Sequence, residues 1–315
     1  MNKPNSELYD EVFRHIADNS EAETLPPKLY FVPTPIGNIG DISLRALTIL
    51  NGVSEIYCED TRNSLKLLNM FHISAKTDCC HQHNEMQRAE EMCRKVAAGI
   101  PIAYISDAGS PGISDPGERI VKYFIEQNMP FEVLPGANAV LPAWLTSGLP
   151  TDKLYFCGFL PRSGTERIAA IEQIRKVQAT SVIYESPLRV GSTLTELYKK
   201  LGERPAALIR ELTKYYEEAV RGNLSTLSER FKLNPPKGEC IIVVGRGEAI
   251  DEGNEKAFKL IKMLIDTGCT AADSARIAAT TFEKPRNAMY KYAVEYSKCI
   301  DSASDEEELS PGVTD

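Results

Sequence analysis

Long apolar runs are missing from this chain of 315 residues. No stretch reaches about eighteen consecutive apolar residues, which excludes a membrane-spanning helix. The first residues also lack the basic start and apolar core of a signal peptide, and we therefore expect a cytoplasmic protein. The 43 % hydrophobic content is ordinary for a globular chain, and the length suits two compact domains.

Disulfide and metal-binding patterns are missing as well. The chain has eight cysteines but no CxxC pair, and several of them lie in apolar runs where a thiol acts as a small hydrophobe. A disulfide framework is not expected in a cytosolic chain of this size. His81, His83 and Glu85 have metal-ligating side chains, but their spacing matches no closed tetrahedral site, and we expect no metal.

The acidic excess of the chain is confined to its two ends. The net charge is −8, from 36 basic and 44 acidic residues. Residues 1–27 contain six acidic and two basic side chains, and residues 301–315 contain six acidic and no basic ones. The remaining 34 basic and 32 acidic side chains leave residues 28–300 close to neutral. We expect both ends to be flexible tails, and the core to lack a broad basic patch.

Strand and helix patterns alternate through the first half of the chain. Residues 29–32 form a short apolar run, a glycine-containing loop follows, and Asp41 is expected to cap a helix whose leucines recur every third residue. Residues 100–105 form a continuous apolar run, which is typical of a strand buried on both faces. The alternation predicts an α/β fold with a mainly parallel sheet covered by helices.

The alternating pattern starts again near residue 150 and gives way to a helical pattern near the end of the chain. A break at Pro285 is expected within the helical part. The predicted parts are an N-terminal extension at 1–27, an α/β domain at 28–149, a second α/β domain at 150–247, a helical segment at 256–298 and an acidic tail at 299–315.

Three loops rich in glycine and small polar residues follow predicted strands directly, at residues 33–38, 106–112 and 134–139. In an open parallel sheet, ligands bind outside the carboxyl ends of the strands, and glycine lets a ligand approach the backbone closely. Any one loop is also explained as a tight turn, but three at one sheet edge favour a ligand site. Because the chain has neither a GxGxxG after the first strand nor a Walker lysine loop, a ligand without phosphate fits better.

Eight motifs follow one another in order between Lys28 and Gly245. They are LYFVPTPIGNIGDISLRAL, IYCEDTR, SDAGSPGISDPG, LPGANA, FCGFLPR, YESPLR, RELTKYYEE and KGECIIVVG. This set resembles the bacterial 16S ribosomal RNA cytidine 2′-O-methyltransferases of the tetrapyrrole methylase superfamily. The resemblance is weaker from Gly245 to about Tyr292, and it does not cover the two tails.

The resemblance implies a particular fold and cofactor. Two α/β domains would enclose S-adenosylmethionine in the cleft between them, and the protein would be a homodimer. Asp107 would favour the positively charged groups of the cofactor, while loop N–H groups would bind its carboxylate. By similarity, the cofactor-binding residues are Ile36, Gly37, Asp107, Gly109, Ser110, Asn138, Ala139, Tyr184 and Gly238.

Methyl transfer to a ribose needs the acceptor oxygen, the methyl group and the sulfur in line, and a nearby base or hydrogen bond helps a poor nucleophile. Asp60, Arg62 and Glu185 are the catalytic candidates, because they lie in motifs at predicted strand ends. Two structural alternatives stay open: Asp60 and Arg62 as an ion pair, and Glu185 as an anchor of the domain interface. The resemblance does not say which residue is the base.

RNA must be held through its phosphates with the ribose presented to the cofactor. The helical segment has alanines and Asp273 where the family usually has lysine, and these departures weaken its case for RNA contact. Ordinary solvated side chains are the alternative for every candidate. The RNA-binding candidates are Arg162, Arg189, Arg210 and Lys214 near the predicted cleft, and Lys284 and Arg286 in the helical segment.

Two other functions are compatible with the same cofactor cleft. A tetrapyrrole C-methyltransferase would have a run of glycines ending in aspartate in its first loop, where this chain has TPIGNIGD. A non-catalytic ribosome-binding relative would not need the cofactor loops. The sequence therefore favours an rRNA methyltransferase. Its near-neutral core predicts recognition of an assembled small subunit rather than of free RNA, because phosphate contacts dominate binding to free RNA.

Overall fold

A computed structural model describes the backbone of residues 25–247 and 252–307, and the side chains of residues 25–247 and 256–297. The chain divides into two compact units, Met1–Arg246 and Gly247–Asp315, which are described separately below. Residues 1–24 of the predicted extension and residues 308–315 of the predicted tail lie outside the described residues. The last residues of the extension pack on the first sheet: Leu25 joins its core, and the Pro26 carbonyl accepts a hydrogen bond from the Tyr30 hydroxyl at 2.9 Å.

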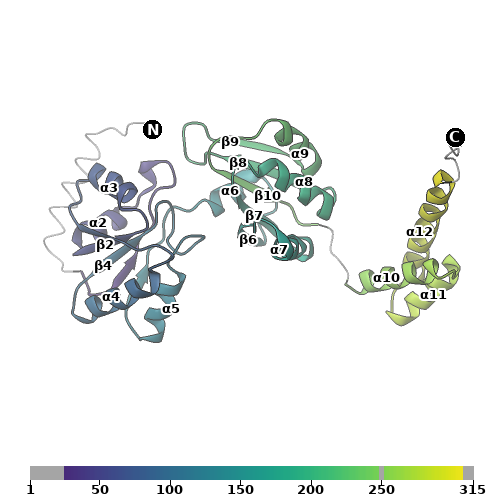
Figure 1. Ribbon diagram of the computed structural model, residues 1–315, viewed down its shortest axis with the longest axis horizontal. Coiled ribbons are helices and arrows are strands. Elements are labelled where there is room, and N and C mark those ends of the chain that lie inside the picture. Colours follow the sequence, from purple (N-terminus) through teal and green to yellow (C-terminus); the bar gives the residue numbers. More distant parts are fainter. Residues whose placement is uncertain (1–24, 248–251, 308–315) are drawn as a thin grey trace, which may run out of the picture. The chain divides into compact units, whose positions relative to one another are not determined.

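The first unit begins with a five-stranded sheet in which all neighbouring strands run parallel, as the alternating pattern predicts (Figure 1). Its spatial order is β3-β2-β4-β1-β5. The three inner strands, β2, β4 and β1, are buried along their whole length. The strands are β1 (Leu29–Phe31), β2 (Glu55–Cys58), β3 (Lys76–Cys79), β4 (Ile102–Ile105) and β5 (Phe131–Val133).

Helices cover both faces of this sheet and form a separate core on each. Residues of α2 and α3 pack with one set of inward-facing strand side chains, and residues of α4 and α5 pack with the other set. The predicted cap of α2 is wrong: Asp41 ends the short 3₁₀ helix η1, and the Ser43 side chain accepts from Ala46 N instead. The elements are η1 (Ile39–Asp41), α2 (Leu44–Gly52), α3 (Thr61–Met70), α4 (Glu85–Ala97) and α5 (Glu118–Glu126).

A second five-stranded sheet follows in the same unit, with the spatial order β6-β7-β10-β8-β9. Only β6 and β7 pair in parallel, because β10 enters between β7 and β8 and runs antiparallel to both. Its helices are α7 (Gly164–Lys176), α8 (Val190–Leu201) and α9 (Leu224–Leu233). Its strands are β6 (Leu154–Phe159), β7 (Thr180–Glu185), β8 (Pro205–Arg210), β9 (Glu218–Asn223) and β10 (Cys240–Val244).

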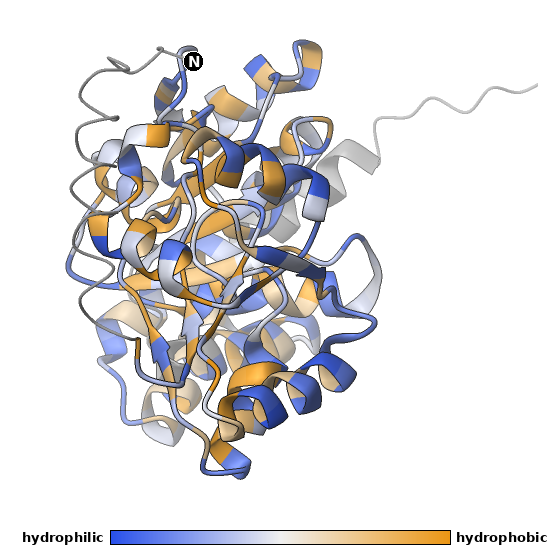
Figure 2. Ribbon diagram, turned by 90° about the vertical axis from the view of Figure 1, so that its left-hand side faces the viewer, coloured by the Kyte–Doolittle hydropathy of each residue, from blue (hydrophilic) through white to orange (hydrophobic). Residues whose placement is uncertain are grey.

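Helix α6 (Val140–Ser147) belongs to the second sheet, although it precedes residue 150. Its buried residues Val140 and Ala143 form one core with Val182, Ala207 and Ile241 of the second sheet. The helix therefore joins the loop after β5 directly to the other sheet. Figure 2 shows helices with hydrophilic and apolar residues on opposite sides, the arrangement expected for helices that pack one face on a sheet.

The described part of the second unit consists of three helices, α10 (Glu252–Asp266), α11 (Ala271–Thr281) and α12 (Arg286–Glu307). The break expected at Pro285 falls between α11 and α12. Phe258 and Tyr292 stack at 3.9 Å between ring centroids within a small core of alanines, Ile261 and Met289. Residues 299–307 of the predicted tail continue helix α12. A helix able to span a membrane is absent from the parts of the chain that the structure describes.

Candidate functional site

One cavity of about 400 Å³ in the first unit is lined by both sheets. The first sheet contributes the loops that follow β1, β4 and β5, and the second contributes strand ends and the loops beside them. The volume is within the range of small-molecule sites in proteins. Residues that line it include Ile36, Ala108, Gly109, Ser110, Ile113, Asp115, Asn138, Ala139, Phe159, Tyr184, Glu185, Ser186, Ile209, Leu212, Gly238, Glu239 and Ile241.

The three glycine-containing loops meet at this cavity, as the sequence predicts. Thr34 and Gly109 form an isolated antiparallel bridge between the first and second loops. The Ser110 hydroxyl donates to the Ala137 carbonyl at 3.2 Å and thereby joins the second loop to the third. Backbone groups of all three loops are held in place by one another, so this wall of the cavity is formed before any ligand arrives.

Gly109 needs the conformational freedom of glycine. Its φ is +80°, and a Cβ atom there would lie 3.2 Å from Cγ2 of Ile36 and 3.6 Å from the Ala137 carbonyl oxygen. A larger side chain would therefore be strained and would occupy space where the three loops converge.

Carboxylates set the electrostatic character of the cavity. Asp115, Glu185 and Glu239 line it, and among the described residues neither a lysine nor an arginine does. Desolvation by burial, with the nearby charges of Glu59 and Asp107, raises the pKa of Asp115 to about 6. Burial also raises the pKa of Glu59. The cavity is therefore suited to a positively charged ligand and poorly suited to a polyphosphate.

Aromatic rings form part of the wall on the second sheet. The Tyr184 ring meets Phe156 edge-on at 5.1 Å and Phe159 at 5.5 Å between centroids. Burial raises the pKa of Tyr184 to about 12, so that its hydroxyl stays protonated at neutral pH. With Ile209, this cluster offers an apolar surface for a flat ring.

Seven of the nine predicted cofactor-binding residues line the cavity, and Gly37 and Asp107 do not. The Asp107 carboxylate accepts from Asp60 N at 3.3 Å and from Asn63 Nδ2 at 3.1 Å, which ties it to the start of α3.

Gly37 serves the contact between the two sheets. A Cβ there would lie 2.5 Å from Cγ of Lys214 and 3.1 Å from the Leu212 carbonyl oxygen. Asn38 N donates to Thr213 Oγ1 at 3.1 Å in the same contact. Thr213 has a φ of +64°, so the loop after β8 is itself in an unusual conformation.

Asp60 and Arg62 lie outside the cavity lining and form the ion pair that was the structural alternative. Asp60 caps α3 by accepting from Arg62 N at 2.9 Å, and its carboxylate accepts from the Arg62 guanidinium at 2.7 Å. These hydrogen bonds lower the pKa of Asp60 to about 2. The Arg62 side chain is 86 % exposed.

Glu185 does line the cavity, but its carboxylate is held by neighbours. One oxygen accepts from the Thr193 hydroxyl at 2.6 Å, and the other accepts from Ser186 N at 2.8 Å and lies 3.4 Å from Nε of Arg189. Thr193 in turn accepts from Arg167 Nη2 at 3.0 Å. This buried network fixes the turn between β7 and α8.

The predicted RNA-binding residues lie in different local environments. Arg162 is exposed, and Arg189 donates to the carbonyls of Leu160 and Pro161 as well as pairing with Glu185. Lys214 pairs with Glu211 at 3.0 Å and with Glu239 at 3.2 Å. Arg210 pairs with Glu218 at 2.7 Å. Lys284 and Arg286 lie in the second unit, between α11 and α12 and at the start of α12.

Sequence reasoning missed several lining residues. Asp115 lies in the motif SDAGSPGISDPG, but the sequence does not show that its side chain lines the cavity. Phe159, Ile209 and Ile241 look like ordinary core residues in the sequence, because the side that faces a ligand depends on how two sheets meet.

His81 and His83 have ring centroids 5.8 Å apart, and within the described residues no three metal-ligating side chains gather.

A family model described as tetrapyrrole (corrin/porphyrin) methylases matches residues 28–228. Proteins named ribosomal RNA small subunit methyltransferase I are similar over most of their length. The one from Synechocystis is 39 % identical, covering 85 % of this chain and 97 % of that protein. The one from Vibrio cholerae is 39 % identical, covering 89 % and 99 %.

The chain belongs to the ribosomal RNA small subunit methyltransferase I family. The Micromonospora olivasterospora member is 38 % identical, covering 84 % of this chain and 85 % of that protein. The predicted resemblance is thereby confirmed.

Solved structures confirm the fold expected for this methyltransferase family. Cobalt precorrin-4 methyltransferase has a TM-score of 0.55 at 16 % identity, covering 70 % of this chain and 95 % of that one. Diphthine synthase has a TM-score of 0.55 at 16 % identity, covering 69 % and 89 %. Uroporphyrin-III C-methyl transferase from Thermus thermophilus, solved in complex with S-adenyl homocysteine, has a TM-score of 0.50 at 17 % identity, covering 71 % and 98 %.

Proposed function

We propose that this chain methylates the ribose 2′-hydroxyl of a cytidine in 16S rRNA of the small ribosomal subunit, with S-adenosylmethionine as the methyl donor. The observation that carries the proposal is similarity over most of the chain to proteins named ribosomal RNA small subunit methyltransferase I. The retained cavity between the sheets adds to it, since a protein that only bound ribosomes would not need one.

The residues of the cavity fit S-adenosylmethionine. This donor carries a methyl group on a positively charged sulfur, and a lining with three carboxylates and no basic side chain favours such a charge. The glycine loops offer backbone groups for its amino-acid end. Ile209, Ile241 and the Tyr184 ring offer an apolar slot for its adenine. Each part of S-adenosylmethionine therefore matches a different part of the cavity wall.

The protein groups act by positioning. The Thr34–Gly109 bridge and the Ser110 hydrogen bond keep the loops rigid, so that a bound donor points in one direction. Glu185 is held by three partners, which suits it to fixing the Ser186–Pro187 turn at the mouth of the cavity more than to exchanging protons. Asp107, Asp60 and Arg62 stabilise the start of α3 beside the site.

The partners and location follow from the substrate. A small ribosomal subunit is a cytoplasmic particle, and we expect the chain to work in the cytoplasm. A homodimer would give a second contact surface to a core that is near neutral in charge. Light scattering of the purified chain tests the dimer, for which a mass of about 70 kDa is expected, twice the 34.9 kDa of one chain.

The test of the function uses labelled S-adenosylmethionine and four potential acceptors. Intact small subunits, naked 16S rRNA, large subunits and tetrapyrrole precursors are incubated separately with the full chain, and mass spectrometry locates the methyl group. We expect label on a cytidine ribose, and more of it on intact subunits than on naked rRNA. Label on a base or on a tetrapyrrole contradicts the proposal.

A further inference from the structure

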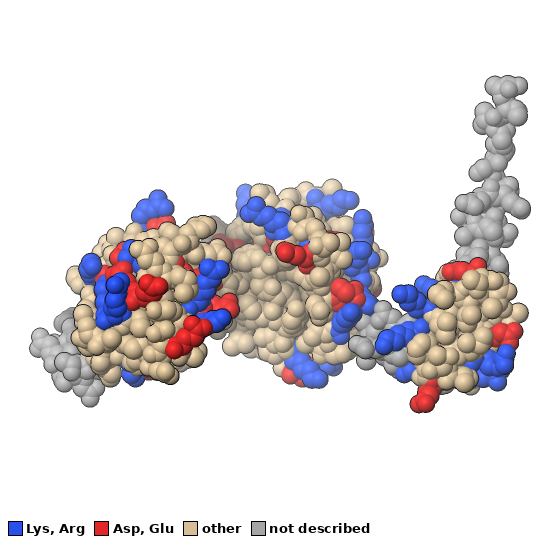
Figure 3. Space-filling view, turned by 60° about the horizontal axis from the view of Figure 1, so that its bottom comes forward, with Lys and Arg blue, Asp and Glu red and all other residues tan. Residues whose placement is uncertain are grey.

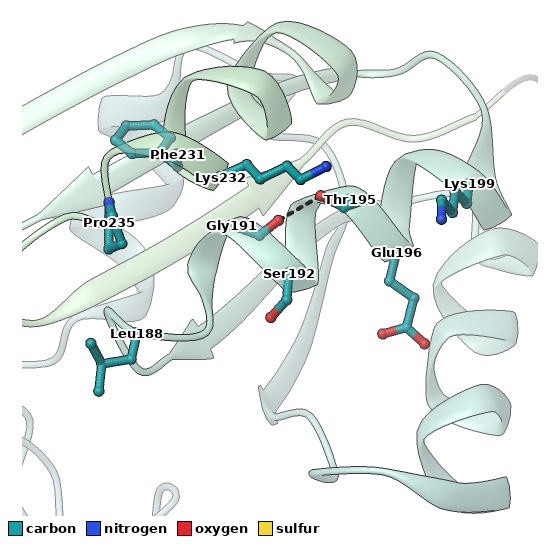
Figure 4. A pocket seen from close by; sticks show the side chains of 9 residues that line it. All are labelled: Leu188, Gly191, Ser192, Thr195, Glu196, Lys199, Phe231, Lys232 and Pro235. Atoms are coloured by element: carbon teal, nitrogen blue, oxygen red, sulfur yellow. Dashed lines mark hydrogen bonds between the residues drawn. The ribbon is translucent and has the colours of Figure 1, made fainter.

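A second hollow lies on the other side of the turn that follows β7 (Figure 4). It is an open groove of about 490 Å³ along the outer face of α8, closed on one side by the end of α9 and the residues after it. Leu188 and Pro235 lie at one end, and Lys199 lies at the other (Figure 4). From Gly191 to Lys199 the helix rises about 12 Å, so the groove is long enough for a short segment of an extended polymer to lie along it.

The floor of this groove is set by close packing of two helices. A Cβ atom on Gly191 would lie 2.5 Å from the Phe231 carbonyl oxygen, so α9 lies directly against the backbone of α8. Ser192 and Thr195 present small polar side chains above this contact. The Ser192 hydroxyl donates to the Arg189 carbonyl at 2.9 Å, and the Thr195 hydroxyl donates to the Gly191 carbonyl at 2.8 Å and contacts the Ser228 hydroxyl at 2.8 Å.

Charge gives the groove its chemical preference. Lys199 and Lys232 line it, are exposed, and have no ion-pair partner among the residues that the structure describes. Its one acidic side chain, Glu196, already accepts from Arg167 Nε at 2.6 Å. Figure 3 shows lysine and arginine side chains grouped on the flank of this sheet where Figure 1 draws α8 and α9. The groove is therefore suited to a polyanion.

The groove and the methyl-donor cavity lie on either side of a single turn. Ser186 and Pro187 line the cavity, and the next residue, Leu188, lines the groove and is 83 % exposed. Glu185 and Arg189 fix the two ends of this turn. A polymer whose reacting group lies at the cavity mouth reaches the groove by crossing Leu188.

We propose that this groove binds the rRNA strand beside the methylated nucleotide, with phosphates at Lys199 and Lys232 and an apolar sugar or base face on Leu188. The inference rests on the proposed function and names the strand path that the function requires. Phosphates bind to lysine as point charges and fix the register of a nucleic acid without reading its sequence. This assigns to α8 and α9 the role that Arg189 and Lys214 were expected to have.

The experiment compares Lys199→Ala and the double variant Lys199→Ala/Lys232→Ala with Lys200→Ala in the full chain. Lys200 follows Lys199 on the same helix but does not line the groove, so Lys200→Ala matches Lys199→Ala in the single positive charge that is lost. We measure affinity for purified small subunits at several salt concentrations, turnover with saturating subunits, and calorimetric affinity for S-adenosylmethionine. The double variant is expected to lose on the order of tenfold in subunit affinity, and its salt slope should fall by roughly 0.7 for each lysine. Affinity for S-adenosylmethionine and the mass in light scattering should not change.

The possible results distinguish a failure of the groove proposal from a failure of the proposed function. Subunit affinity and salt slope equal to those of Lys200→Ala, with the unaltered chain active, overturn the groove alone. A changed oligomeric mass in the double variant places a second copy of the chain in the groove and also overturns it. An unaltered chain that binds S-adenosylmethionine but neither binds nor methylates small subunits overturns the proposed function and the strand path with it.

Discussion

Thr34 and Gly109 exchange two backbone hydrogen bonds, each 2.9 Å long, and so join the loop after β1 to the loop after β4. The bridge lies beyond the ends of both strands, where a parallel sheet has no ladder to hold its loops. It brings Gly109 within reach of Ile36 and Ala137, at the point where the predicted loops converge. A change at Gly109 therefore tests the cavity without touching the sheet.

Gly109→Ala should weaken binding of S-adenosylmethionine at least about tenfold, because its Cβ would enter a contact of 3.2 Å with Ile36 and displace a cavity wall. Gly99→Ala is the matched control. Gly99 has the same left-handed backbone, with φ +84° against +80°, but a Cβ there meets nothing within 4 Å. Both variants should lose about 1–2 kcal/mol of unfolding free energy from backbone strain. Equal calorimetric affinities in the two variants would remove Gly109 from the site.

Asp115 should make binding of S-adenosylmethionine depend on pH. Desolvation raises the pKa of its carboxyl to about 6 in the free protein, so at pH 5 it is mostly protonated and no longer favours a cation. We expect affinity to fall by up to about tenfold from pH 7 to pH 5. Asp115→Asn should bind with the weaker affinity at both pH values. Asp41→Asn is the control: Asp41 is exposed and does not line the cavity, so this variant should keep the pH dependence of binding. If the two variants show the same pH dependence, a group other than Asp115 causes it.

The same pKa has a consequence for stability. Because the folded protein holds the Asp115 proton more tightly than the unfolded chain does, the ionised carboxyl opposes folding above about pH 6. Asp115→Asn should therefore raise the unfolding free energy of the ligand-free protein above pH 6. The gain should shrink as the pH falls toward the ordinary value of 3.8. Urea unfolding at pH 4.5 and pH 8 measures it, and a gain that grows on acidification would contradict the burial of this group.

Thr193→Val should destabilise the first unit by about 2–3 kcal/mol, because it removes one buried hydrogen bond from Glu185 and one from Arg167. Valine keeps the shape of threonine, so the loss of unfolding free energy measures the contribution of the hydroxyl. Thr48→Val is the control, since its hydroxyl bonds only to the helical Leu44 carbonyl, and should stay within about 0.5 kcal/mol of the unaltered chain. Equal denaturation midpoints for the two variants would mean that the network does not hold the β7–α8 turn.

Gly37 and Lys214 should be energetically coupled. Gly37→Ala places a Cβ 2.5 Å from Cγ of Lys214, so it should weaken the contact between the sheets and reduce affinity for S-adenosylmethionine. Lys214→Ala removes that atom, and the double variant should recover part of the loss, because Thr213 Oγ1 at 2.8 Å still crowds the new methyl group. We expect a coupling energy of about 0.5–2 kcal/mol from the double-mutant cycle. Strictly additive losses would show that the two residues act independently.

Much of the fold was predictable from local patterns. The continuous apolar run of β4 predicted a strand buried on both faces, and the alternation with helices predicted the parallel first sheet. Strand β9 and helix α9 were not foreseen. Strand β9 has the sequence EAVRGN and lies at a sheet edge, where few positions need to be apolar. The placement of α6 on the second sheet depends on Val140 and Ala143 finding partners far along the chain.

The candidate site divides in the same way. Its glycine loops were visible because a ligand-binding loop after a buried strand has a distinct composition. The partners of the Asp60 and Glu185 carboxylates could not be predicted, since a carboxylate in a sequence motif looks the same whether it contacts a ligand or a neighbouring side chain. Within the described residues Lys199 and Lys232 have no ion-pair partner, and this also depends on which acids lie nearby. The acid beside them, Glu196, is bound by Arg167 from another helix.

By itself, the sequence determined the family, the two α/β halves and the three loops at one sheet edge, because hydrophobic periodicity and glycine position act within a few residues. Only the tertiary structure decided which polar groups are free to meet a ligand. Asp60 and Arg62 satisfy each other, Glu185 is bound by Thr193, and Asp115 faces the cavity partly desolvated. The physical reason is that a charged group is stabilised by whichever partner is nearest in space, and proximity in space is set by the packing of two sheets.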